Sequence, residues 1–215
     1  MNAANDLPVL YSFRRCPYAM RARMAIAISQ TNVRLREVLL KNKPDEMIAA
    51  SQKGTVPVLI ENGAVIDESI AVMRWALSKN DPEGWLARED DAAALIEEND
   101  GAFKHHLDRY KYAARYDGAD PETHRQAGMK FIEKLEAHLE AHAFLSGPKR
   151  SFADIAVFPF IRQFRIADKD WFDAAPIPNV QRWLETLMSS DLFTSVMRKY
   201  PVWKETKEEF LFPQF

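Results

Sequence analysis

The sequence predicts an α/β domain followed by an all-α helical domain, and three observations carry that prediction. Over the first 80 residues, short apolar runs typical of strands alternate with patterns typical of helices. A polar, turn-rich segment then interrupts the chain at Asn80-Asp81-Pro82-Glu83-Gly84. Beyond it we find helical patterns and no convincing strand pattern. We therefore expect a first domain over residues 1–80, a linker over 81–86 and a helical domain over 87–215.

The first domain opens with a strand, a helix and a second strand. Residues 9–13 form a short apolar run, and residues 20–28 carry Met, Ala and Ile at helical spacing. Residues 33–39 show the alternation of apolar and charged side chains that is typical of a strand. This order predicts a right-handed parallel βαβ unit.

The rest of the first domain adds a helix, a hairpin and a final helix. Residues 43–45 open a short helix that runs to about residue 50. Residues 58–60 and 65–66 then flank Asn62-Gly63, and Asn-Gly is the strongest short-range hairpin signal. Ser69 is the expected N-cap of the last helix. The resulting order, βαβαββα, is that of a thioredoxin-like domain.

The second domain is expected to consist of helices throughout. The expected helices span residues 88–116 and 121–142 and begin at Ser151 and after Pro178, Ser190 and Tyr200. Ser151-Phe152-Ala153-Asp154 matches a capping box in which Asp replaces the usual Glu. The helix that it starts is apolar on most sides and should be buried. We interpret Asp154 as a capping residue rather than a catalytic one.

The amino-acid composition indicates which binding partners and which cellular compartment to expect. The chain has 215 residues, of which 47% are hydrophobic and 28% charged, as in a globular protein that buries a full core. A net charge of −2 gives no reason to expect nucleic acid or a membrane surface as a partner. We find no signal-peptide pattern and no apolar run of about 18 residues. The single cysteine excludes an intramolecular disulfide, so we expect a cytoplasmic protein.

That cysteine lies where the first strand gives way to the first helix, in Cys16-Pro17-Tyr18-Ala19. At a helix N-terminus, unpaired backbone N–H groups and the helix dipole favour negative charge. Such a position lowers a thiol pKa from about 8.5 to roughly 3.5–7.5, and the thiolate is the nucleophilic form. Pro17 suits the first helical position. We interpret Cys16 as a reactive thiol, although a lone cysteine is more often a small buried hydrophobe.

Four arginines near the motif add positive charge, but they are weaker evidence. Arg21 and Arg23 are two residues apart and point to different sides of a helix, so we expect at least one of them to be solvated. The other two are Arg14 and Arg15.

In its two-domain order and its motifs, the chain resembles the cytosolic glutathione S-transferases. Cys16-Pro17-Tyr18-Ala19 is similar to the cysteine-containing classes, which are the omega-like transferases, the dehydroascorbate reductases and the two-domain glutaredoxins. The resemblance also includes Lys43-Pro44, Val56-Pro57-Val58-Leu59, Asp67-Glu68-Ser69 and Ser151-Phe152-Ala153-Asp154-Ile155-Ala156. Arg150 departs from the family, which commonly has an apolar residue there. The resemblance implies the glutathione S-transferase fold, glutathione as co-substrate and a homodimer.

The resemblance also implies a glutathione site, with a role for each residue. Pro57 would be the family's cis-proline, which leaves the backbone of Val56 free to pair with the tripeptide. Glu68 would bind the α-ammonium of the γ-glutamyl group, and Ser69 at a helix N-terminus would bind its carboxylate. Lys43 would reach the glycine carboxylate. The full implied set is Tyr18, Lys43, Val56, Pro57, Glu68 and Ser69, with Cys16 as the catalytic residue.

Two chemistries are possible on this scaffold. Conjugation uses a hydroxyl that donates to the glutathione thiolate, and Tyr11 or Ser12 would have to supply it. Cysteine suits that role poorly because S–H is a weak donor. It is well suited to attack a disulfide and form a mixed disulfide with glutathione. Ala19 stands where a dithiol enzyme has its second cysteine, so a second glutathione would resolve the adduct.

We therefore expect monothiol, glutathione-dependent thiol transfer, as deglutathionylation or dehydroascorbate reduction. The alternatives are conjugation by Tyr11 or Ser12 and a non-catalytic interaction module on the same fold. We expect the acceptor to lie between the domains, with His106, Arg109, Tyr110 and Trp203 among the candidates that line it.

Two further expectations concern a metal and the chain's end. His105 and His106 are adjacent and diverge on a helix, and no Cys or acidic partner has ligand spacing, so we expect no metal site. The aromatic segment over residues 210–215 is too apolar to extend into solvent. We expect it to dock on the body of the protein or at a subunit contact.

Overall fold

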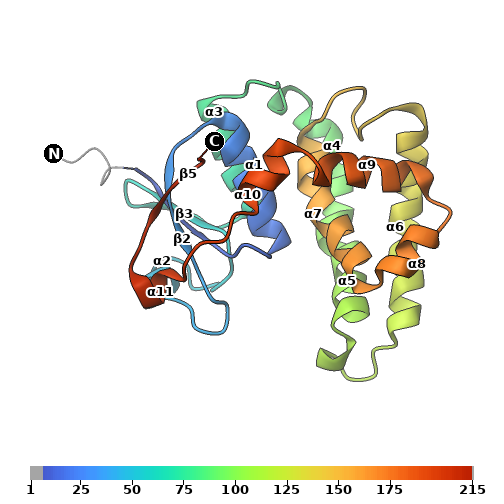
Figure 1. Ribbon diagram of the computed structural model, residues 1–215, viewed down its shortest axis with the longest axis horizontal. Helices are drawn as coiled ribbons and strands as arrows, with labels where there is room; N and C mark the ends of the chain where they lie inside the picture. The colour runs from blue at the N-terminus through green and yellow to red at the C-terminus, as the bar shows by residue number, and fades with distance from the viewer. Residues whose placement is uncertain (1–6, 215) are drawn as a thin grey trace. The chain divides into compact units, whose positions relative to one another are not determined.

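The computed structural model describes residues 7–214, and its contacts divide the chain into two compact units (Figure 1). One unit combines the residues up to Pro82 with those from Ser190 onward, and the other spans Glu83–Ser189. The residues from Ser190 onward, which the sequence placed in the helical domain, therefore pack with the first unit.

The first unit is built on a sheet (Figure 1), and its strands follow the order β4-β3-β1-β2-β5. The strands are β1 (Val9–Ser12), β2 (Val33–Glu37), β3 (Val58–Glu61), β4 (Ala64–Ile66) and β5 (Phe210–Phe212). β1 and β2 are parallel, whereas the other pairings are antiparallel. The expected βαβ unit and hairpin are confirmed, and with them the thioredoxin-like arrangement.

The central helix of this unit is buried on nearly all sides. The unit's helices are α1 (Pro17–Ser29), α2 (Asp45–Ala50), α3 (Ser69–Lys79), α10 (Asp191–Val196) and α11 (Trp203–Thr206). α1 packs against both α3 and α10. Its small and apolar residues allow that close packing, and it ends at Gln30, whose left-handed backbone (φ 55°) stops the helix.

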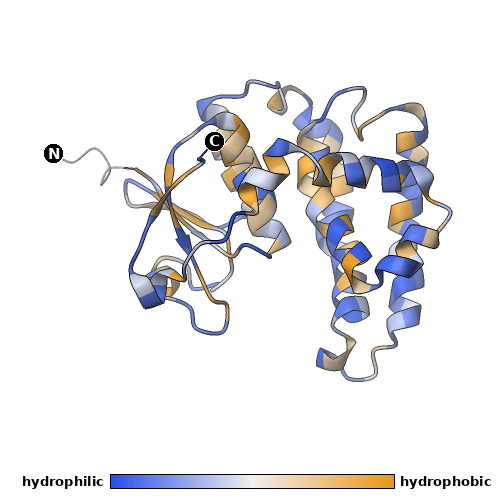
Figure 2. Ribbon diagram, in the orientation of Figure 1, coloured by the Kyte–Doolittle hydropathy of each residue, from blue (hydrophilic) through white to orange (hydrophobic). Residues whose placement is uncertain are grey.

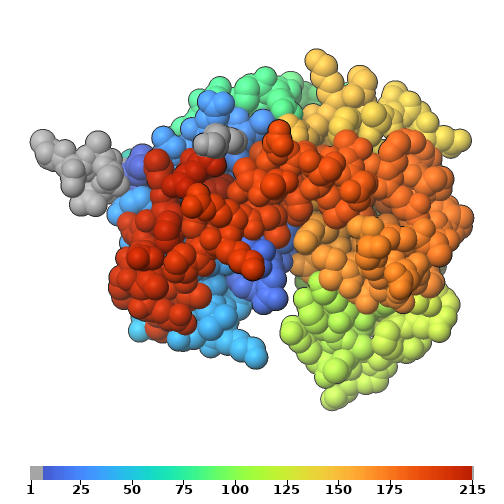
Figure 3. Space-filling model, viewed as in Figure 1, coloured from blue at the N-terminus to red at the C-terminus, as the bar shows by residue number. Residues whose placement is uncertain are grey.

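The expectation of helices alone after residue 84 fails at the chain's end, because residues 210–212 form strand β5. β5 pairs with β2 through Phe212 opposite Val33, and the Phe212 side chain is buried. In Figure 3 the C-terminal segment, drawn in red, covers part of the first unit on the face shown. Docking of this segment on the protein body is thus confirmed for residues 210–214, and Phe215 lies outside the described residues.

The second unit is built from helices that are joined by loops. It contains α4 (Glu89–Glu98), α5 (Lys104–Lys111), α6 (Pro121–Ala141), α7 (Phe152–Ala167), α8 (Lys169–Ala174) and α9 (Pro178–Met188). The single helix expected over residues 88–116 is divided by a π-helical turn at Asn99–Phe103 and ends in a 3₁₀ turn, Ala113–Arg115. The short helix α8 was not expected. None of the helices in residues 7–214 is both long and apolar enough to cross a bilayer.

α7 is the buried helix of the second unit and is predominantly apolar, whereas α6 is coloured as more polar in Figure 2. The capping box at its start is present. The buried Asp154 carboxylate accepts hydrogen bonds from Ser151 N at 2.8 Å, Leu145 N at 2.9 Å and Trp183 Nε1 at 2.7 Å. The carboxylate thus joins three segments of this unit, which supports the structural interpretation of Asp154.

Arg150 is the residue at which the sequence departs from the family pattern. Its Nε donates to Glu83 Oε2 at 3.1 Å.

Candidate functional site

Cys16 occupies the N-cap of α1, as the sequence predicts. Its backbone is extended (φ −74°, ψ 126°), and Pro17 is the first helical residue. The Cys16 amide donates to Phe13 O at 3.0 Å, and its carbonyl accepts from Met20 N at 2.9 Å. The residue is partly exposed. The thiol therefore lies at the positive end of a 13-residue helix without being sealed from solvent.

The Cys16 sulfur faces the segment that leads into β3. Its Sγ lies 3.7 Å from the carbonyl oxygen of Val56, and the peptide bond between Val56 and Pro57 is cis. Cys16 also packs against a buried cluster of the first unit that includes Val56, Val58 and Trp203. Two segments 40 residues apart thus meet at the sulfur.

A buried arginine lies beneath the loop that carries the cysteine. Arg23 donates to Ser12 Oγ at 2.5 Å, Phe13 O at 3.3 Å, Arg14 O at 2.7 Å and Val196 O at 3.1 Å. Burial lowers the pKa of Arg23 to about 10, so it remains charged at neutral pH. The charge interaction between Cys16 and this guanidinium favours both ionised forms.

A carboxylate completes this network on the other side of the loop. Glu37 at the end of β2 is buried and accepts from the backbone N–H of Arg14 at 2.8 Å. Burial raises the pKa of Glu37, while that hydrogen bond and the charge of Arg23 oppose the rise. The expectation that Arg21 or Arg23 would be solvated is wrong, because neither side chain is more than 2% exposed. The other sides of this helix are apolar, and that pattern could have indicated that both arginines are buried.

The residues expected to bind the γ-glutamyl group lie at the start of α3. Glu68 is the N-cap and Ser69 the first helical residue, so the expected N-cap at Ser69 is one residue too late. The buried Ser69 Oγ accepts from Arg21 Nε at 3.0 Å. The Glu68 side chain is exposed, and its carboxylate pairs with Lys53 Nζ at 2.6 Å. Charged and polar groups are thus present at the N-terminus of an 11-residue helix.

Tyr18 and Lys43 lie in two different places around Cys16 and the start of α3. The guanidinium of Arg21 lies 5.0 Å from the centroid of the Tyr18 ring, which links Tyr18 to the Ser69 hydroxyl through one side chain. Lys43 is half-buried, and its ammonium group lies beside Gly54, 3.7 Å from the position that a Cβ there would take. Lys43 therefore lies close to the segment that precedes Val56.

The two hydroxyls considered for conjugation are both buried and already hydrogen-bonded. The Tyr11 hydroxyl accepts from Arg36 Nη1, and its ring packs edge-on against Trp203 at 5.9 Å. Ser12 is fully buried, with its Oγ accepting from Arg23. Burial raises the pKa of Tyr11. The Tyr11 ring belongs to the buried cluster against which Cys16 packs, but its hydroxyl, like that of Ser12, is hydrogen-bonded to an arginine.

The residues expected to line an acceptor site are distributed over both units. Trp203 is buried in the first unit, with the Arg36 guanidinium 4.3 Å from its ring centroid. His106, Arg109 and Tyr110 lie on α5 of the second unit. Tyr110 packs against Phe164 at 4.8 Å, and burial raises the pKa of its hydroxyl.

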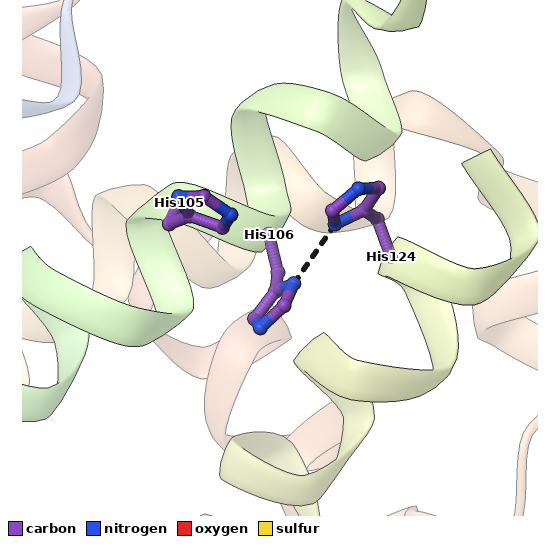
Figure 4. Close-up of side chains that lie close together, drawn as sticks. All are labelled: His105, His106 and His124. Atoms are coloured by element: carbon purple, nitrogen blue, oxygen red, sulfur yellow. Dashed lines mark hydrogen bonds between the residues drawn. The ribbon is translucent and has the colours of Figure 1, made fainter. Parts of the chain in front are cut away.

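A third histidine, which was not expected from the sequence, joins the adjacent pair on α5. His124, on the first turns of α6, brings its Nδ1 to 2.9 Å from Nδ1 of His106 (Figure 4). One ligand atom from each of His105, His106 and His124 lies within 4.8 Å of the others. Because His124 is 18 residues away on another helix, only the packing of α5 against α6 reveals the cluster.

The fold defines a two-domain protein with a thioredoxin-like first domain and a helical second domain, and the comparisons with known proteins agree. The model of the glutathione S-transferase N-terminal domain matches residues 10–84, and that of the C-terminal domain matches residues 84–186. A protein of Aplysia californica named "Probable glutathione transferase" is 33% identical over 93 residues, which are 43% of this chain and 97% of that protein. The chain belongs to the glutathione S-transferase family.

Two further comparisons define the extent of the likeness. A protein of Oryza sativa subsp. japonica named "Probable glutathione S-transferase DHAR2, chloroplastic" is 24% identical over 187 residues, and the match covers 85% of this chain but 65% of that protein. A glutathione transferase family member from Pseudomonas fluorescens pf-5, solved with two glutathione bound, superposes with a TM-score of 0.75 at 18% identity. That match covers 89% of this chain and 92% of the other.

Proposed function

We propose that this protein is a glutathione-dependent thiol transferase that acts through a mixed disulfide between Cys16 and glutathione. The observation that carries the proposal is the position of Cys16 Sγ at the N-cap of α1, 3.7 Å from the carbonyl of Val56. A sulfur there has the helix N-terminus to favour its ionised form, and it faces the backbone expected to pair with the tripeptide.

The reaction has two exchange steps. The Cys16 thiolate attacks the glutathione sulfur of a glutathionylated acceptor, so that the Cys16–glutathione bond forms and the acceptor leaves as a thiolate. The thiolate of a second glutathione then attacks the glutathione sulfur of this adduct, which releases glutathione disulfide and regenerates the Cys16 thiolate. Ala19 has no thiol to replace that second glutathione. Deglutathionylation follows this scheme directly, and dehydroascorbate reduction is the other form of the activity we propose.

The bound tripeptide would extend from the N-terminus of α3 to Lys43. Glu68 and the first-turn amides of α3 offer a carboxylate for the α-ammonium and N–H donors for the α-carboxylate. The Val56 backbone would pair with the cysteinyl residue beside Pro57, and Lys43 would neutralise the glycine carboxylate. Tyr18, on the first turn of α1, would border the γ-glutamyl end.

Arg23 supports the thiolate in this scheme without touching the substrate. Its guanidinium donates to Ser12, Phe13 and Arg14, which lead from the end of β1 toward Cys16, and it contributes a positive charge that interacts with the sulfur. We assign Arg23 as a positioning residue.

Two assays run side by side distinguish thiol transfer from conjugation. We expect the protein to reduce hydroxyethyl disulfide with glutathione and to conjugate 1-chloro-2,4-dinitrobenzene poorly. Cys16→Ala should abolish the disulfide activity, whereas Tyr11→Phe should retain it. Conjugation that survives Cys16→Ala and fails in Tyr11→Phe would replace this proposal with the hydroxyl mechanism. Full inactivity with a normal, unreactive thiol would favour the non-catalytic role.

We also propose a reducing, cytoplasmic compartment and a homodimer. The compartment follows from a mechanism that needs Cys16 as a free thiol supplied with glutathione. The homodimer follows from membership of the family. Light scattering on the purified protein should give twice the chain mass, and a monomer at micromolar concentration would contradict the assembly.

A further inference from the structure

The three-histidine cluster of the second unit lies outside the proposed thiol chemistry. His105 and His106 extend from α5, and His124 extends from α6 toward them (Figure 4). The rings of His106 and His124 have centroids 5.1 Å apart, and those of His105 and His124 are 5.9 Å apart. Three imidazoles from two packed helices therefore converge on one volume.

We propose that His105, His106 and His124 form a binding site for a divalent transition-metal ion of the zinc class. This proposal reverses the expectation of no metal, which considered only the adjacent pair on α5. Imidazole nitrogen is a preferred ligand for such ions, and three protein ligands with an exchangeable water in the fourth position are a common zinc arrangement.

The distances between the histidine nitrogens are close to those that coordination requires. Tetrahedral zinc with Zn–N bonds of 2.0–2.1 Å places its ligand nitrogens about 3.3 Å apart. The Nδ1 atoms of His106 and His124 lie 2.9 Å apart, so they need to separate by only a few tenths of an ångström to admit an ion between them. All three ligand atoms lie within 4.8 Å of one another, so any closer approach of the third ring is a movement of at most about 1.5 Å. Rotation of His105, which is exposed, can supply that movement.

The hydrogen bond between two of the rings must give way to the ion. A ligating imidazole must be neutral and must offer a lone pair. Nδ1 of His106 and Nδ1 of His124 share one hydrogen bond, so its proton must leave the position between them before both nitrogens can bind an ion.

One cation already competes for the site. Arg109 Nη1 lies 3.0 Å from Nδ1 of His105, and because arginine can only donate, the imidazole nitrogen accepts. A metal ion that uses this nitrogen must displace the guanidinium. Removing Arg109 should accordingly strengthen binding, which a purely structural histidine cluster does not predict.

Calorimetric titration with Zn²⁺ alone tests the site, using protein without a polyhistidine tag and carrying Cys16→Ala so that the thiol cannot bind metal. We expect a single equivalent to bind, and His124→Asn to weaken that binding by more than about tenfold, because even the loss of a group that only supports a ligand typically costs that much. His138→Asn is the matched control, because His138 lies exposed on the same helix α6, and it should leave the affinity unchanged. Arg109→Met should tighten binding.

Each other outcome overturns the assignment. No saturable binding would exclude the site, and equal losses in His124→Asn and His138→Asn would reduce it to nonspecific surface binding. Unchanged or weaker affinity in Arg109→Met would show that His105 is not a ligand, and the three-histidine site would then be wrong. Should His124→Asn fail to fold, His106→Gln provides the same comparison. The Cys16→Ala background cannot perform the proposed thiol chemistry, so this result is independent of it.

Discussion

At the residue scale, Arg23 connects the fold to the reactivity of the thiol. A buried guanidinium is costly to desolvate, and the structure compensates it with four hydrogen-bond acceptors and the nearby Glu37 carboxylate. Three of those acceptors belong to the residues just before the N-cap of α1. The loop geometry and the charge near the sulfur therefore depend on one side chain.

Replacing Arg23 with Met should slow the reaction of Cys16 with iodoacetamide at neutral pH several-fold. The positive charge is lost, so ionisation of the thiol should require a higher pH. The measurement is the alkylation rate as a function of pH. Arg23→Lys keeps the charge while losing most of the hydrogen bonds, so its pH profile should stay closer to that of the original protein. Superimposable profiles for all three proteins would show that Arg23 serves folding alone.

Glu68 provides the corresponding test for glutathione binding. Its carboxylate is exposed and pairs only at the surface with Lys53, so Glu68→Gln should leave the thermal midpoint unchanged. A lost hydrogen bond between charged groups is worth about 1.5–3 kcal/mol, so KM for glutathione should rise at least about tenfold. Glu97→Gln, an exposed change on α4, is the control. An unaltered KM for glutathione in Glu68→Gln would show that Glu68 does not bind glutathione.

At the element scale, the start of α7 depends on one carboxylate. Replacing Asp154 with Ala leaves the buried N–H groups of Leu145, Ser151 and Trp183 without this acceptor. Each costs about 1–3 kcal/mol when unsatisfied, so the free energy of unfolding should fall by at least about 3 kcal/mol. Asp120→Ala removes an exposed N-cap on α6 and should cost only about 1 kcal/mol. Urea denaturation compares the two, and equal losses would contradict this ranking.

The packing of α6 against α7 leaves no room for a side chain at Gly128. A Cβ there would lie 2.7 Å from Cε2 of the fully buried Phe164 ring. Gly128→Ala should therefore destabilise the protein by about 1–3 kcal/mol, although alanine is the better helix former. Gly101→Ala meets nothing within 4 Å and should be neutral or slightly stabilising. A thermal midpoint that rises in Gly128→Ala would show that the two helices can separate.

At the scale of the whole molecule, local patterns in the sequence predicted most of the fold. The apolar run over residues 9–13, the Asn62-Gly63 turn and the capping box at Ser151 each carry their signal within a few residues, and each corresponds to an observed element. The position of Cys16 at the N-cap of α1 was predictable for the same reason.

The features that were missed depend on contacts between distant segments. Strand β5 forms because residues 210–212 pair with β2, about 175 residues earlier in the chain, and three apolar residues alone give no strand signal. The burial of Arg23 depends on Val196, and the histidine cluster depends on His124 from a second helix. Periodicity describes one element at a time and cannot reveal such partners.

The most direct test of the central claim is the intact mass of the protein after exposure to oxidised glutathione. The proposed chemistry predicts one glutathione adduct per chain, located at Cys16, absent from Cys16→Ala and removed when reduced glutathione is added. A protein that stays unmodified under these conditions, or an adduct that reduced glutathione cannot remove, would contradict it.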